Sequence, residues 1–165
     1  MTSNYLTHLG LSVSFLLASL SLSSESIATS KGFDSSARVV LKDNVPCFFV
    51  DRPDDTQLPV GQSLAVEINR GPTAWNIYEN SGKENFPNSA ARCVKYGADW
   101  PTGKVVKAPQ ALQYGVPYYA DIETEYRFRV EFCLSHDVHG KPQLTQWTND
   151  GKHCTDKPVN ETDSP

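Results

Sequence analysis

The segment from Tyr126 to Leu134, Y-R-F-R-V-E-F-C-L, alternates between apolar residues at even positions and Arg, Glu or Cys at odd positions. Successive side chains of a β-strand point to opposite faces of the sheet. The pattern therefore predicts a strand with one face in the core and the other face outward, and Cys133 belongs to the outward face. A helix is not expected here, because the apolar residues of an amphipathic helix recur every three to four positions.

Similar alternation recurs in short runs that are separated by residues typical of turns, and no long run has helical periodicity. We expect residues 97–110 to connect two strands without forming one. We expect strands over residues 37–41, 45–50, 63–69, 73–78, 92–96, 112–123, 126–134 and 143–148. Roughly seven or eight short strands at this spacing predict an all-β single domain, an antiparallel β-sandwich of immunoglobulin or fibronectin type III character.

The start of the 165-residue chain is typical of a secretory signal. The 14 residues from Leu9 to Leu22 are mostly apolar, and Ser26-Ile27-Ala28 fits the small-x-small cleavage pattern. This run is shorter than the roughly 20 residues that span a bilayer, so we expect no membrane span. The expected organisation is a signal peptide over 1–28, a flexible segment over 29–36, the β-sandwich domain over 37–155 and a disordered tail over 156–165.

All four cysteines, Cys47, Cys93, Cys133 and Cys154, follow this segment. An even number in an exported chain favours two disulfides, and the wide spacing argues against a structural zinc site. The alternation places Cys47, Cys93 and Cys133 opposite the core, so the bridges are expected on outer faces or edges. Of three possible pairings we expect Cys93–Cys133 with Cys47–Cys154, which would tie the C-terminal end to the early strands, while the other two stay open.

Charge gives no indication of a nucleic-acid partner. The formal net charge is −4, and Lys and Arg are scattered among acidic residues without forming a basic run. A basic patch or stripe is what nucleic-acid-binding domains present. We therefore expect neither nucleic acid nor a cofactor as a ligand.

After the alternating segment, Ser135, His136, Asp137 and His139 bring nucleophile, base and ligand chemistry together. A catalytic nucleophile, base and acid form a hydrogen-bonded line, whereas adjacent residues of an extended segment diverge. One exposed loop also offers a metal at most three ligands here. The residues that follow, G-K-P, favour a solvated hairpin tip. We expect no catalytic or metal role, and we regard His136, Asp137, His139 and the outward Trp147 as candidate partner contacts.

Six segments in a fixed order carry a family resemblance: D-N-V-P-C-F at Cys47, A-W-N-I-Y at Trp75, R-C-V-K-Y-G at Cys93, L-Q-Y-G-V-P-Y from Leu112, Y-R-F-R-V-E-F-C-L-S through Cys133, and L-T-Q-W-T-N-D-G-K-H-C ending at Cys154. Together they resemble the immunity periplasmic lipoproteins associated with bacterial type VI secretion. The resemblance implies an exported β-domain that binds and neutralises a toxic effector protein in the periplasm, without catalysis. Family members typically carry a lipobox cysteine, but no Cys precedes Cys47, so we expect a soluble protein without a lipid anchor.

Two other functions remain as alternatives. A structural or adhesive surface domain, such as a pilus-type subunit, would need an alternating donor strand at one terminus, and neither 29–36 nor 156–165 has that pattern. A small secreted metal-dependent hydrolase would use His136, Asp137 and His139. We expect a binding module and not an enzyme.

Overall fold

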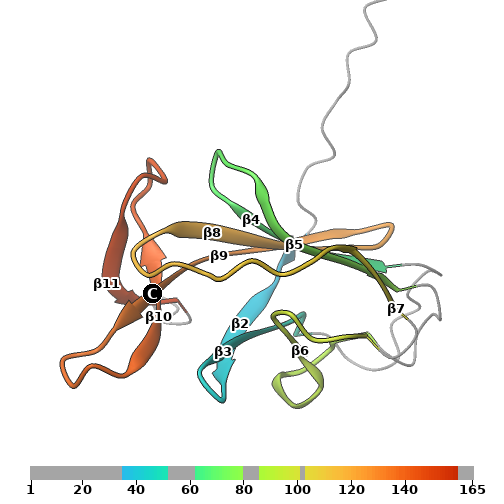
Figure 1. Cartoon of the computed structure of the whole chain (residues 1–165), viewed down its shortest axis with the longest axis horizontal. Coiled ribbons are helices and arrows are strands. Elements are labelled where there is room, and N and C mark those ends of the chain that lie inside the picture. The colour runs from blue at the N-terminus through green and yellow to red at the C-terminus, as the bar shows by residue number, and fades with distance from the viewer. Residues whose placement is uncertain (1–34, 52–61, 80–85, 101–102, 160–165) are drawn as a thin grey trace, which may run out of the picture. The chain divides into compact units, whose positions relative to one another are not determined.

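The computed structural model describes residues 35–51, 62–79, 86–100 and 103–159, whose course Figure 1 shows. Within these ranges no helix is long and apolar enough to cross a bilayer. The expected signal peptide over 1–28 lies outside the described residues. The elements are β1 (Ser35–Ser36), β2 (Arg38–Lys42), β3 (Val45–Phe49), β4 (Gln62–Ile68), β5 (Thr73–Glu79), the 3-10 helix η2 (Ala90–Arg92), β6 (Val94–Lys95), β7 (Gly103–Lys107), β8 (Pro117–Glu123), β9 (Arg127–His136), β10 (Pro142–Trp147) and β11 (Cys154–Pro158).

The larger sheet has the strand order β11-β10-β9-β8-β4-β5-β7, and every pair of neighbours in this order is antiparallel. One edge of β9 pairs with β8 from Arg127 to Cys133. The other edge is shared, because β1 pairs in parallel with Phe128 and Arg129, whereas β10 pairs with the segment from Cys133 to His136. Strand β9 therefore pairs with three strands, β8, β1 and β10.

The smaller sheet, β2-β3-β6, lies on one side of the larger sheet (Figure 1). Its β2–β3 hairpin turns at Asp43 and Asn44, whose φ angles are 54° and 63°. Two consecutive left-handed residues are what a two-residue type I′ hairpin turn requires, and Asp and Asn tolerate this conformation better than most residues. This turn sets the register that pairs Lys42 with Val45.

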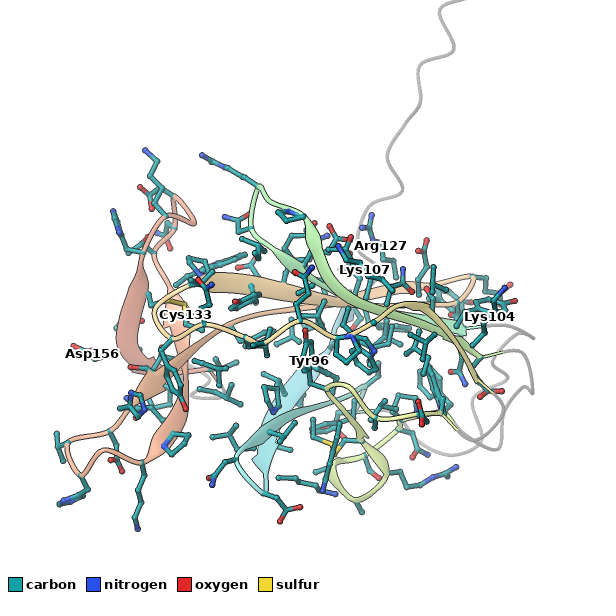
Figure 2. The ribbon with its side chains drawn as sticks, in the orientation of Figure 1. Tyr96, Lys104, Lys107, Arg127, Cys133 and Asp156 are labelled. Carbon is teal, nitrogen blue, oxygen red and sulfur yellow. A yellow bond between two sulfur atoms is a disulfide. The ribbon has the colours of Figure 1, made fainter. Side chains whose placement is uncertain are left out.

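Aromatic side chains fill the space between the two sheets (Figure 2). The ring of Phe48 in β3 lies 5.5 Å from the ring of Phe132 in β9, which in turn stacks on Tyr118 of β8 at 5.6 Å. Trp75 of β5 packs edge-on against Tyr96, which follows β6, at 5.2 Å. These contacts join the layers, and the expected antiparallel β-sandwich is confirmed.

The outer face of the larger sheet is polar but not fully solvated. Asp121 of β8 is only 4% exposed and forms ion pairs at 2.7 Å with both Arg127 and Arg129 of β9. Arg129 also lies over the ring of Tyr119, 3.8 Å from its centroid. The hydroxyl of Tyr119 donates to Glu67 of β4 at 2.5 Å. The alternation expected for β9 is confirmed, although its outward residues are held in a network across three strands.

Several expected boundaries are wrong, and the strand expected over 112–123 begins only at Pro117. Residues 97–110 contain β7, and β9 continues beyond Leu134 to His136. The expected tail starts inside β11, whose backbone pairs with β10, and the Val159 backbone N–H donates to Leu144 at 3.3 Å. The segment expected to be flexible contains β1, which pairs with β9. These differences concern backbone pairing, which side-chain alternation does not report.

All four cysteines are paired, as expected, but the expected pairing is wrong. The bridges are Cys47–Cys93 and Cys133–Cys154, so each lies within one sheet. Cys47 in β3 is next to β6, which Cys93 immediately precedes, and Cys154 begins the added strand β11. Cys133 lies on the face of β9 opposite Phe132, as expected, yet both Cys47 and Cys133 are fully buried. Figure 2 labels Cys133 next to the disulfide sulfurs.

We predict that the two disulfides contribute unequally to stability. Their cysteines are 46 residues apart in Cys47–Cys93 and 21 apart in Cys133–Cys154. Chain-entropy estimates of loop closure give about 4 kcal/mol for the longer loop and about 3 kcal/mol for the shorter one. Urea unfolding of the two paired Cys→Ala variants will compare the losses, and peptide mapping without reductant will verify the pairing. A larger loss for the Cys133–Cys154 variant, or peptides linking Cys93 to Cys133, would contradict this assignment.

Candidate functional site

The β9–β10 turn is held by one carboxylate. The side chain of Asp137 accepts the backbone N–H groups of His139 and Lys141, each at 2.8 Å. The backbone of Asp137 also donates to the Lys141 carbonyl at 2.8 Å, and Gly140 takes a left-handed φ of 77°. The segment from Tyr126 to Lys141 is thus a strand that runs into an ordered turn, as expected.

The polar groups of this tip serve local structure. The backbone N–H of Lys141, together with that of His139, keeps the pKa of the Asp137 carboxyl below its usual range because both donate to the ionised form. The His136 imidazole stacks on Tyr114, with ring centroids 3.9 Å apart and planes 15° from parallel. These contacts do not arrange Ser135, His136 and Asp137 into a nucleophile–base–acid line. In the described ranges, no three His, Cys, Asp or Glu side chains form a group suited to a metal.

Val138 is the residue at this tip that sequence reasoning missed. It is 95% exposed, whereas most apolar side chains of the strands are buried. His139, Gly140 and Lys141, which follow it, are also exposed. A lone Val among polar turn residues breaks no periodic pattern, so its exposure becomes visible only once the turn is placed.

A second candidate region is a pocket of about 640 Å³ on the outer face of the larger sheet. The β4–β5 turn supplies Asn69 and Arg70, β9 supplies Glu131, and β10 and the turn after it supply Trp147 and Asn149. Trp147 is partly exposed on the outward face, as expected, and its indole N–H donates to the Glu131 carboxylate. This hydrogen bond holds the ring at the pocket wall.

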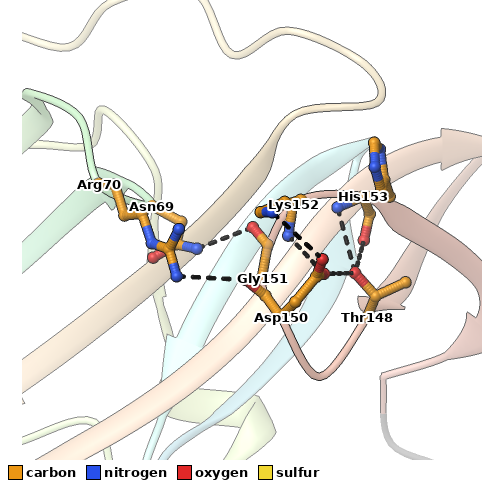
Figure 3. Close-up of polar contacts among 7 residues, drawn as sticks. All are labelled: Asn69, Arg70, Thr148, Asp150, Gly151, Lys152 and His153. Atoms are coloured by element: carbon orange, nitrogen blue, oxygen red, sulfur yellow. Dashed lines mark hydrogen bonds and ion pairs between the residues drawn. The ribbon is translucent and has the colours of Figure 1, made fainter.

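Two turns meet at the pocket rim, as Figure 3 shows. The amide of Asn69 donates to the Gly151 carbonyl at 2.8 Å, and Arg70 reaches the Asp150 carbonyl at 3.5 Å. These contacts join residues about eighty positions apart in the chain, so no local pattern could indicate them. The rim brings together polar side chains that the sequence leaves unrelated.

The β10–β11 turn is itself ordered by Asp150. Its carboxylate accepts the Thr148 hydroxyl at 2.5 Å and the Lys152 backbone N–H at 3.1 Å (Figure 3). The Thr148 hydrogen bond, aided by that of Lys152, keeps the pKa of the Asp150 carboxyl below its usual range. The Oδ1 atom of Asp150 is therefore engaged within its own turn, and its Oδ2 atom lies 3.9 Å from the Lys152 ammonium.

We predict that Gly151→Ala destabilises the protein more than Gly140→Ala. Both glycines have left-handed φ angles, 67° and 77°, so both substitutions cost about 1 kcal/mol in backbone conformation. A Cβ at Gly151 would lie 2.3 Å from the Asn69 amide nitrogen, whereas a Cβ at Gly140 meets nothing within 4 Å. Displacing Asn69 breaks its hydrogen bond and adds about 1 kcal/mol. Thermal unfolding will measure both losses, and equal losses would contradict the contact between the two turns.

Comparison with known proteins does not assign the chain to a family. No family model, no curated protein and no solved structure matches it. The resemblance to the immunity periplasmic lipoproteins therefore stays a prediction.

Proposed function

We propose that this chain is an exported immunity protein that binds and neutralises a secreted toxic effector in the periplasm, by protein–protein contact and without catalysis. Two disulfides fit an oxidising compartment, in which such bonds persist. The resemblance of six sequence segments supports the family, and the disulfide-stapled sandwich supports a rigid binding module.

The observation that carries the proposal is Val138, 95% exposed at an ordered tip. Leaving an apolar side chain in water gains nothing for the free protein, whereas its burial in a partner contributes about 1.5–3 kcal/mol. The Asp137 hydrogen bonds fix the tip before binding, so little conformational entropy is lost on association. The tip is thus suited to insert Val138 into an apolar pocket of the partner.

The charges around Val138 indicate which groups would surround the apolar pocket of the partner. Lys141 is an exposed cation, whereas the Asp137 carboxylate is taken up by the backbone N–H groups of His139 and Lys141. An effector surface with acidic groups around an apolar pocket would complement this tip. Where this pocket is the active-site cleft of an enzyme toxin, binding of the tip would block access to the cleft.

We predict that Val138→Asp abolishes protection while leaving the fold unchanged. A carboxylate placed in an apolar pocket must lose its hydration without gaining a partner, so affinity should fall at least about tenfold, or ~1.4 kcal/mol. The matched control is Val106→Asp, which changes another exposed Val, 62% exposed, on β7. Protection is measured by growth of sensitive cells that export both this chain and the toxin encoded beside its gene, and affinity is measured by calorimetry.

Two outcomes would refute parts of this proposal separately. Absence of protection by the parent chain against that toxin would refute the immunity function. Protection by Val138→Asp equal to that of the parent, or equal loss in Val138→Asp and Val106→Asp, would refute the tip as the contact surface. Circular dichroism melting of both variants controls for folding.

A further inference from the structure

The pocket between the β4–β5 and β10–β11 turns has no role in the function proposed above. Its volume of about 640 Å³ is within the range of about 300–1,000 Å³ typical of small-molecule sites. Most of its lining side chains are polar, and Trp147 is the aromatic one. We propose that it binds a neutral saccharide, with one sugar ring against the Trp147 indole.

The charges of the pocket favour a neutral ligand. The pocket is lined by Arg70 and by the carboxylates of Glu131 and Asp150, and the Lys152 ammonium lies 3.9 Å from Asp150. Two cations and two carboxylates leave no net charge at this site. An anion attracted to Arg70 would meet Glu131, and a cation attracted to Glu131 would meet Arg70.

The hydrogen-bonding groups match a polyhydroxyl ligand. Each sugar hydroxyl donates one hydrogen bond and accepts up to two, so it needs both donors and acceptors nearby. Arg70 supplies donors, Glu131 supplies acceptors, and the amide of Asn149 supplies both. An apolar ligand would displace water from these groups without replacing its hydrogen bonds, which is unfavourable.

The aromatic wall is fixed in advance. The indole N–H of Trp147 is held by Glu131, so the ring does not have to be ordered when a ligand binds. The face of an aromatic ring is electron-rich and attracts the slightly positive C–H groups that one side of a pyranose presents. The hydroxyl groups at the ring edge would then reach the turn residues Arg70 and Asn149.

The test uses the chain from residue 29 onward, after the expected signal peptide, and the fluorescence of Trp147. Of the three tryptophans, Trp75 is fully buried and Trp100 is 4% exposed, so ligand-dependent changes in emission report on Trp147. The probes are maltotriose and chitotriose, which distinguish a glucose-type from an N-acetylglucosamine-type ligand. Arginine amide and inorganic phosphate serve as charged probes. We expect a saturable change with at least one trisaccharide and none with the charged probes.

Variants assign the binding to this pocket. Trp147→Ala, measured by calorimetry, should weaken saccharide binding at least about tenfold. Asn149→Ala, at an exposed turn position, should weaken it severalfold with little effect on folding, so the test stands even if Trp147→Ala is unstable. Tyr114→Ala, which removes an aromatic side chain 47% exposed outside the pocket, should leave binding unchanged.

Three results would overturn the inference. They are no saturable response to either trisaccharide up to high millimolar concentrations, saturable binding of a charged probe in preference to both sugars, and saccharide binding that survives both Trp147→Ala and Asn149→Ala. None of them bears on the immunity function, which depends on Val138 at a different turn.

Discussion

The two-faced pairing of β9 is the constraint on which the rest of the structure depends. Its even positions place Phe128, Val130 and Phe132 in the core. Its odd positions hold Arg127 and Arg129 against the buried Asp121 of β8. A shift of one residue in register would exchange these faces, placing arginines in the core and removing both partners of Asp121. Burial and ion pairing therefore favour the same register.

The sequence predicts the interior of this fold better than its edges. Alternation identified β2, β3, β4, β5, β8, β9 and β10, because each has apolar side chains at intervals of two. It missed β7 and β11, which are the two edge strands of the larger sheet. Edge strands often carry Lys or Pro, which discourage pairing with other chains. Here Lys104 and Lys107 in β7 and Pro158 in β11 interrupt the apolar alternation from which strands were predicted.

Disulfide pairing and the candidate surfaces depend on contacts between distant segments. The cysteines pair according to which strands lie side by side, and no local pattern contains that order. The sequence placed Trp147 on the outward face, but it could not reveal Asn69 and Arg70 beside Gly151. The tip at Asp137 was predictable because its hydrogen bonds are local. Recognition is thus proposed at two places. The tip at Val138 could be predicted from local sequence, whereas the pocket at Trp147 is formed only by the fold.

The central structural claim is that the two sheets form one core through Phe48 and Phe132, whose rings are 5.5 Å apart. The most direct test is a double-mutant cycle with Phe48→Leu, Phe132→Leu and the double variant, followed by urea unfolding. Contacting aromatic rings are coupled by about 0.5–1.5 kcal/mol, and we predict a coupling energy in that range. Additive losses, with a coupling energy below about 0.3 kcal/mol, would contradict direct packing of the smaller sheet on β9.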